Sequence, residues 1–205
     1  MKDVITLTGK YEARIYEPKP QWRQACNLTL RVLDLLDGVR GMRWARIKLN
    51  QLLPRMATPK GVLPVPNTVM TLGKNYLLDN GMAGSGYTAA VYMGLISSTS
   101  YSAISAADTA ASHAGWLEAG GSNAPTYSGN RKTVTWSAAS SGSKVTDVMT
   151  FTLTGVGTIK GVAMWFTTAT KDATTGTLFS AGLSAGGDDT VKSGDFAQVT
   201  YTLSA

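Results

Sequence analysis

The chain has 205 residues and a formal net charge of +6, from 19 basic and 13 acidic residues. Its single cysteine, Cys26, excludes an intrachain disulfide and a cysteine-based metal cluster. The N-terminal residues form no apolar signal region, and no stretch reaches the ~18 apolar residues of a membrane span. We therefore expect a soluble, unexported protein that has no membrane partner.

The positive charge is concentrated in one segment. Residues 21–60 contain eight basic and two acidic residues, whereas the rest of the chain has eleven of each. The basicity therefore belongs to this segment alone, and the remainder of the chain is electrically neutral.

Residues 4–17 predict strands, because apolar and polar residues alternate from Tyr11 to Ile15. The period then changes. From about Gln24 to Asp37 the apolar spacing is that of one helical face, formed by Leu28, Val32, Leu35 and Leu36. Glycines follow, and a second helix is predicted to end at Pro54. The basic segment is thus predicted to be a helical hairpin.

The run from Gly61 to Asn67 is rich in proline, which favours an extended edge or connector over a central strand. A short helix-like turn is predicted at 74–79. Beyond residue 80, Gly, Ser and Thr separate short β-favouring runs. These predicted strands are Tyr87–Ile96, Arg131–Ser137, Val148–Thr154, Thr158–Thr167, Thr177–Leu183 and Ala197–Leu203.

Alternation within these runs indicates sheets with one buried and one solvated face. We predict a mainly β fold, a jelly-roll-like antiparallel β-sandwich with a short helical insertion near the N-terminus. Residues 1–17 would join the β body, residues 18–60 would form the basic insertion, and residues 61–205 would form the body itself.

The only histidine, His113, lies next to Ser112 and five residues after Asp108. Neighbouring residues rarely point at one another as a hydrolytic triad requires, and no nucleophile-elbow pattern surrounds the serine. A histidine in a loop or an interface is the better interpretation, and we expect a protein that is not an enzyme.

Two other patterns also have simpler interpretations. The pair Asp188–Asp189 is typical of a turn between strands, and no calcium-binding repeat surrounds it. The run from Gly81 to Gly86 lacks the lysine of a phosphate-binding loop and favours a β connection. We expect no metal and no cofactor.

The basic segment is the strongest functional feature. Its candidate partner-docking residues are Trp22, Arg40, Arg43, Trp44 and Arg46. Docking onto an acidic protein neighbour is the favoured hypothesis. A plain solvated helix face remains open, and nucleic-acid binding, with tryptophans stacked on bases, is the least favoured.

Several short motifs resemble those of small structural proteins of tailed bacteriophages. They are Gly73–Asp79, Tyr92–Ile96, Ala106–Thr109, His113–Trp116, Thr174–Gly182 and Ser193–Asp195. The resemblance covers about two thirds of the chain, together with the strand from Gly9 to Tyr16. Where the group is expected to turn tightly after this strand, the present chain inserts residues 18–60.

The resemblance implies a virion protein made in the host cytoplasm. It points to a capsid decoration (cement) protein that forms a dimer or trimer and clamps neighbouring subunits of the major capsid protein. A tail-fibre subunit or a fibre adaptor bound to tail components is the alternative. A module that binds host carbohydrate through residues such as Trp116 and Tyr127 is a lesser one.

Overall fold

The computed structural model describes residues 7–39, 41–82, 90–185 and 188–204. The strands are β1 (Thr8–Pro18), β2 (Ala57–Val69), β3 (Val91–Ser97), β4 (Lys132–Thr133), β5 (Ser143–Val145), β6 (Met149–Thr152), β7 (Gly157–Phe166), β8 (Thr177–Leu183), β9 (Asp189–Val191) and β10 (Phe196–Ser204). The helices are α1 (Arg23–Leu36), α2 (Arg43–Leu52) and α3 (Thr71–Met82), with 3-10 turns at Pro20–Trp22 and Leu53–Met56.

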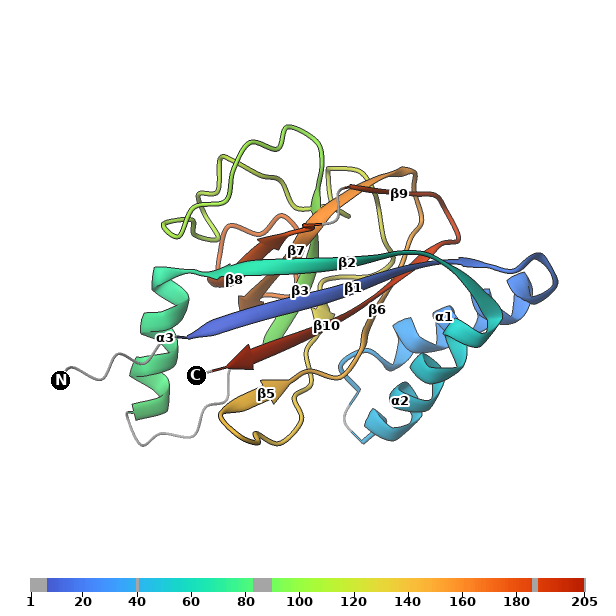
Figure 1. Cartoon of the computed structure of the whole chain (residues 1–205), viewed down its shortest axis with the longest axis horizontal. Helices are drawn as coiled ribbons and strands as arrows, with labels where there is room; N and C mark the ends of the chain where they lie inside the picture. The colour runs from blue at the N-terminus through green and yellow to red at the C-terminus, as the bar shows by residue number, and fades with distance from the viewer. Residues whose placement is uncertain (1–6, 40, 83–89, 186–187, 205) are drawn as a thin grey trace.

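Within the described residues, ten antiparallel strands form one curled sheet (Figure 1). Its order is β4-β3-β7-β8-β2-β1-β10-β5, with β6 beside β10 and β9 beside β7. Strand β2 joins the two halves, because most of it pairs with β1 while its last residues pair with β8. The predicted mainly β antiparallel sandwich with a helical insertion is confirmed, and its two layers belong to one sheet.

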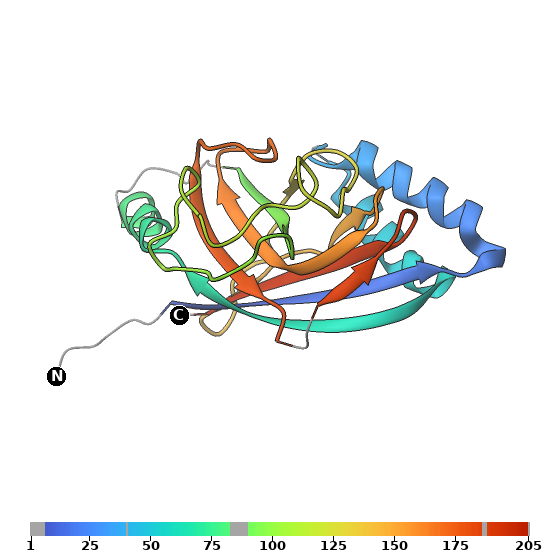
Figure 2. The same ribbon diagram turned by 90° about the horizontal axis from the view of Figure 1, so that it is seen from above.

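The main core lies between the two layers, which Figure 2 shows edge-on. Tyr11 of β1 and Tyr201 of β10 pack with ring centroids 4.5 Å apart, and Phe179 of β8 meets Tyr201 from the opposite layer. Met149, Phe151 and Leu153 are buried, as the alternation around Phe151 predicted, but Thr150 is buried too, because it lies beneath α2 and donates a hydrogen bond to Asn50. These strands therefore bury one face against the opposite layer, as their period of two requires.

The run at residues 61–67 is extended, as predicted, and over Gly61–Pro66 it pairs with a strand, β1, on one side only. Strand β2 as a whole lies inside the sheet order because Asn67–Val69 pairs with β8. The carbonyl of Pro64 accepts a hydrogen bond from the backbone N–H of Ala185, on the side away from β1. The nitrogen of a strand residue faces the same side as its carbonyl, so the Pro64 nitrogen, which carries no hydrogen, also faces away from β1. Pro66, two residues on, faces the same way. The prolines therefore interrupt no hydrogen bond of the β1–β2 ladder.

Other predicted elements differ in length. The strand expected over 131–137 is only two residues long, β4, and the helix-like turn at 74–79 is part of the longer α3. Strands β5 and β9 had not been predicted. The run Tyr87–Ile96 corresponds to β3, although residues 83–89 lie outside the described part.

A long loop, residues 98–131, covers the outer side of β3, β7 and β8. Trp116 of this loop is fully buried, with its ring centroid 6.2 Å from that of Trp165 on β7. A separate apolar cluster forms there with Met70, Ile96 and Leu178. The part of this layer around Trp116 lies away from the helical hairpin, whereas its end meets the hairpin through Lys132, which binds both Ser128 and Asp34.

Candidate docking surface

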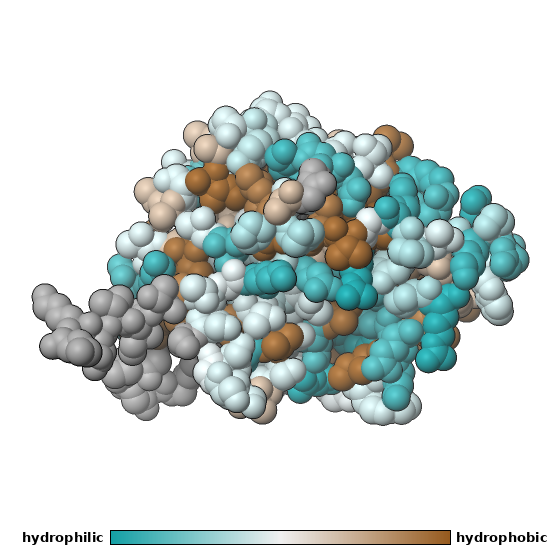
Figure 3. Space-filling model, viewed as in Figure 1, coloured by the Kyte–Doolittle hydropathy of each residue, from teal (hydrophilic) through white to brown (hydrophobic). Residues whose placement is uncertain are grey.

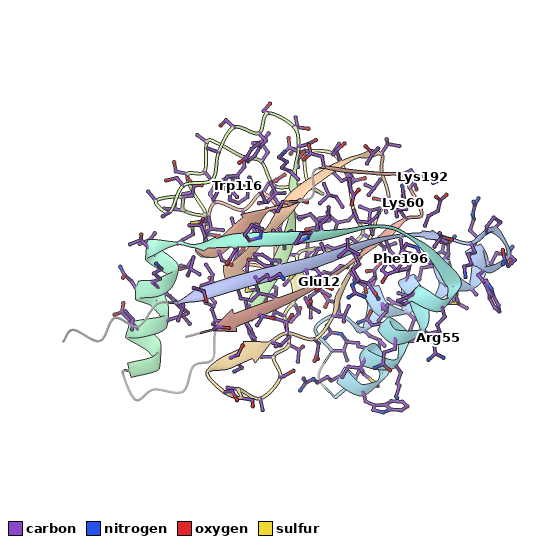
Figure 4. The ribbon with its side chains drawn as sticks, viewed as in Figure 1. Glu12, Arg55, Lys60, Trp116, Lys192 and Phe196 are labelled. Carbon is purple, nitrogen blue, oxygen red and sulfur yellow. The ribbon has the colours of Figure 1, made fainter. Side chains whose placement is uncertain are left out.

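The helical hairpin, defined here as residues 19–56, is inserted between β1 and β2. Its base is closed by a backbone hydrogen bond of 3.1 Å from the Lys19 N–H to the Met56 carbonyl. Its apolar underside packs on a stacked pair from neighbouring strands, Tyr16 and Phe196, whose ring centroids are 5.0 Å apart (Figure 4). The residues that pack there are Cys26, Leu30, Leu33, Leu53 and Met56.

Ion pairs fasten the turn of the hairpin to the body. Lys132 of β4, almost completely buried, lies 2.6 Å from the Asp34 carboxylate. The backbone N–H of Thr133 donates to Asp37, which also lies 3.5 Å from the Arg46 guanidinium. Burial raises the pKa of the Asp37 carboxyl, and the nearby charges of Lys132 and Arg46 act against that rise. Both acidic residues of the hairpin, Asp34 and Asp37, therefore contact the β body of the same chain.

A further polar network forms under α2. The Asn50 side chain donates to the Val148 carbonyl at 2.9 Å and accepts from the Thr150 hydroxyl at 2.6 Å. The Gln198 amide donates to the Asn50 backbone carbonyl at 2.9 Å. Buried polar groups that are hydrogen-bonded in this way fix one packing arrangement. The hairpin is thus a fixed part of the fold and not a loosely attached arm.

The outward side of the hairpin carries apolar groups that the body does not cover. Leu28 is 66% exposed, Leu35 is 77% exposed and Trp44 is 72% exposed. Other large apolar residues with substantial exposure are Trp22, Val39, Met42 and Leu52. An exposed set of this size on one element is typical of an interaction site.

Basic residues accompany these apolar groups. Arg23, Arg31, Lys48 and Arg55 are exposed, and no described carboxylate forms an ion pair with any of them. On the face seen in Figure 3, hydrophilic residues dominate the hairpin end, with hydrophobic groups among them. We call the exposed apolar and basic residues named in this and the preceding paragraph the hairpin surface. It is cationic and partly apolar.

The five predicted docking residues have different environments. Trp22 and Trp44 belong to the hairpin surface. Arg43 is about half exposed, but it makes a bidentate pair with Asp147 at 2.7 and 2.8 Å. Arg46 is turned inward, with 12% of its side chain exposed, and binds Asp37 and the Thr133 carbonyl. Arg40 lies outside the described residues. Arg46 therefore helps to hold the hairpin in place, and the docking role of these residues stays a prediction.

Helix α1 was predicted from an apolar face that includes Leu28 and Leu35, but the body buries a different face. Leu28 and Leu35 point away from it, while Cys26, Leu30 and Leu33 are buried. Helix α1 thus carries two apolar stripes, of which one is used by the fold. The exposed stripe was visible in the sequence as a spacing, but its exposure was not.

The candidate triad does not assemble. The Asp108 carboxylate accepts hydrogen bonds from the Trp116 indole at 2.9 Å and from the Ser105 N–H at 3.0 Å. His113 stacks on Trp116 with ring centroids 4.1 Å apart. Within the described part of the chain, no hydrogen bond joins His113 to either Ser112 or Asp108. The arrangement is that of a packed loop.

The other candidate sites are also placed. Asp188 forms an ion pair with Lys160 at 2.7 Å, and Asp189 begins β9. No group of three metal-ligating side chains occurs among the residues described. Helix α3 ends at Met82, and the rest of the glycine run at 81–86 lies outside the described residues.

Comparisons with known proteins returned no match to a family model, a curated protein or a solved structure. In the described part of the chain, none of the helices has the length and apolar character needed to cross a membrane.

Proposed function

We propose that this chain is a structural protein of a tailed bacteriophage particle, a capsid decoration protein that docks onto neighbouring subunits through its hairpin surface. The observation that carries the proposal is a set of exposed apolar residues, Leu28 and Leu35 on α1 and Trp44 on α2, on a hairpin rigidly fixed to a β body. A fixed surface loses little conformational freedom when a partner binds. The resemblance of several short motifs to those of phage structural proteins supports the same assignment.

Charge complementarity indicates the chemistry of the partner. The unpaired charges of the hairpin surface are all basic, so an acidic surface with an apolar centre would match it. The body of a second copy offers less of this kind, since six of the 11 acidic residues outside the hairpin already form ion pairs among the described residues. The hairpin surface is therefore proposed to bind another virion protein, and the dimer or trimer contact would use a different face.

Particle binding by matched variants tests this proposal. Leu35→Ser with Trp44→Ser removes the two most exposed of these residues, and Leu78→Ser with Val156→Ser removes two residues of comparable exposure, 62% and 69%, outside the hairpin. We expect the first variant to lose at least ~10-fold in copies per purified particle and the control to match the native protein, because hot-spot residues cost ~2 kcal/mol or more. Equal copy numbers for both variants would refute docking through the hairpin surface.

The copy number itself distinguishes the shell from the tail. We expect hundreds of copies per particle for a decoration protein, whereas tens or fewer would favour a tail-fibre subunit or adaptor. The two residues proposed for the carbohydrate-binding alternative, Trp116 and Tyr127, are not accessible. Trp116 is fully buried and Tyr127 is 3% exposed, so neither offers a ring for a sugar to stack on.

A further inference from the structure

A shallow, open pocket of about 450 Å³ lies in the loop layer. Figure 4 places Trp116 of this layer and Arg55 of the hairpin in opposite corners of the molecule. Its walls come from residues 110–123 and from the loop after β7, at Asp172 and Thr174. Its volume falls in the ~300–1,000 Å³ range of small-molecule sites.

The buried carboxylate of Glu118 holds the two walls together. Glu118 accepts from Arg131 at 2.8 and 2.7 Å, and both residues are 2% exposed. The Arg131 guanidinium also lies 3.8 Å from the centre of the Trp165 ring. Glu118 accepts a third hydrogen bond, 2.8 Å long, from the backbone N–H of Asp172. The charge of Glu118 is therefore balanced, and the pocket is formed before any ligand arrives.

The polar atoms around the pocket are mainly acceptors and hydroxyls. His113 Nδ1 lies 3.0 Å from the Trp116 carbonyl oxygen, so in the neutral ring it must donate, which leaves Nε2 as an acceptor. Asp172 Oδ2 accepts from the Ser122 N–H at 2.7 Å, while its Oδ1 has no hydrogen-bond donor among the described residues. Asn123 donates through Nδ2 to the Glu118 carbonyl at 3.1 Å, which leaves its Oδ1.

The lining excludes several ligand classes. No lysine or arginine is among the described residues that line the pocket, so a phosphate or carboxylate would find no cation. Only one carboxylate, Asp172, remains unbalanced there, which is too few for a metal ion. The methyl groups of Ala111 and Ala114 add a small apolar wall. Acceptors, hydroxyls and methyl groups together match a neutral ligand that carries many hydroxyl donors.

The backbone of the Asp172 wall is unusual. Asp172 has a φ of 57°, in the left-handed region that Asp enters more readily than most residues. Here the Glu118 carboxylate provides the anchor by accepting the Asp172 N–H.

We propose that this pocket binds one or two rings of a neutral saccharide, with ring hydroxyls donating to Asp172, His113 and Asn123. The site is independent of the hairpin surface. A protein docked through the hairpin would leave the opposite corner, and so the pocket, open to solvent.

Saturation-transfer NMR on the purified chain tests the proposal. The probes are glucose, galactose, mannose, N-acetylglucosamine and their disaccharides, with inorganic phosphate and sialic acid as anionic comparisons. We expect transfer to at least one neutral saccharide and to neither anion. Asp172→Ala should weaken that binding ~10-fold or more, because a hydrogen bond to a charged group is lost. Asp79→Ala, which removes an exposed carboxylate on α3, should leave it unchanged.

Ala111→Phe, at an exposed position of the wall, narrows the pocket and should also abolish transfer, so the test does not depend on the folding of the Asp172 variant. The proposal would be overturned if no neutral probe showed transfer, or if only the anions did. It would also be overturned if a folded pocket variant, Asp172→Ala or Ala111→Phe, bound the saccharide as well as the native chain does.

Discussion

Lys132 and Lys160 form ion pairs of nearly equal length in very different surroundings. Lys132 lies 2.6 Å from Asp34, with 5% and 19% of the two side chains exposed. Lys160 lies 2.7 Å from Asp188, with 24% and 37% exposed. Replacing each lysine by methionine removes the ammonium group and keeps most of the side-chain volume. The comparison sets a buried lysine contact against a largely exposed one.

Removing one partner of a fully buried pair costs ~3–5 kcal/mol, because the remaining charge is left unpaired. Asp34 keeps some contact with water, so we expect Lys132→Met to cost about 2–4 kcal/mol. This value includes loss of the 3.1 Å hydrogen bond from Lys132 to the Ser128 carbonyl. Lys160→Met should cost less than ~1 kcal/mol, as exposed pairs do.

Urea unfolding at neutral pH measures both free energies. Since Lys132 also joins the hairpin to the body, hydrogen exchange in α1 should become faster in Lys132→Met and stay unchanged in Lys160→Met. Adding Asp34→Asn to Lys132→Met removes the unpaired charge and should recover part of the loss. If the two lysine variants differed by less than ~0.5 kcal/mol, burial of the hairpin contact would not have the energetic role assigned to it.

Three further predictions concern packing and pH. Leu30 is 1% exposed on the buried side of α1, and Leu30→Ala should lower the free energy of unfolding by about 2–5 kcal/mol. A loss below ~1 kcal/mol would contradict its place in the apolar cluster between the hairpin and the body. A Cβ at Gly61 would lie 2.5 Å from Asp189 Oδ2, so Gly61→Ala should destabilise by about 1–3 kcal/mol, and adding Asp189→Ala should relieve the clash. Burial raises the pKa of the Asp189 carboxyl, and the nearby charge of Lys60 opposes the rise. The stability that this group contributes is therefore present below its unfolded pKa of ~3.9 and is lost as the pH rises through its higher folded pKa. Asp189→Asn should therefore stabilise the chain at pH 7, with a gain that shrinks towards pH 4, and thermal melts that show no such pH dependence would refute this.

Local patterns predicted the elements that are long and periodic. The strand expected at 177–183 matches β8 at both ends, and the hairpin expected from Gln24 to Pro54 contains α1 and α2. Strands β5 and β9 have three residues each, too few for a period to show. They exist because neighbouring strands pair with them.

The features that define the candidate sites depend on tertiary contacts. Spacing showed that Leu28 and Leu35 share a helical face, but α1 has a second apolar stripe, and only packing decides which one is covered. Arg46 resembled its basic neighbours in sequence, yet its contact with Asp37 turns it inward. The Glu118–Arg131 pair behind the pocket joins loop residues that no short motif connects.

Zero-length carbodiimide cross-linking of purified particles tests the central claim most directly, because this reagent joins a lysine amine to a carboxylate in contact with it. Lys48, on the hairpin surface, should link to an Asp or Glu of another virion protein. Lys74, exposed on α3, serves as the control and should not. Links to that protein from Lys74 and none from Lys48 would contradict docking of the hairpin onto an acidic partner.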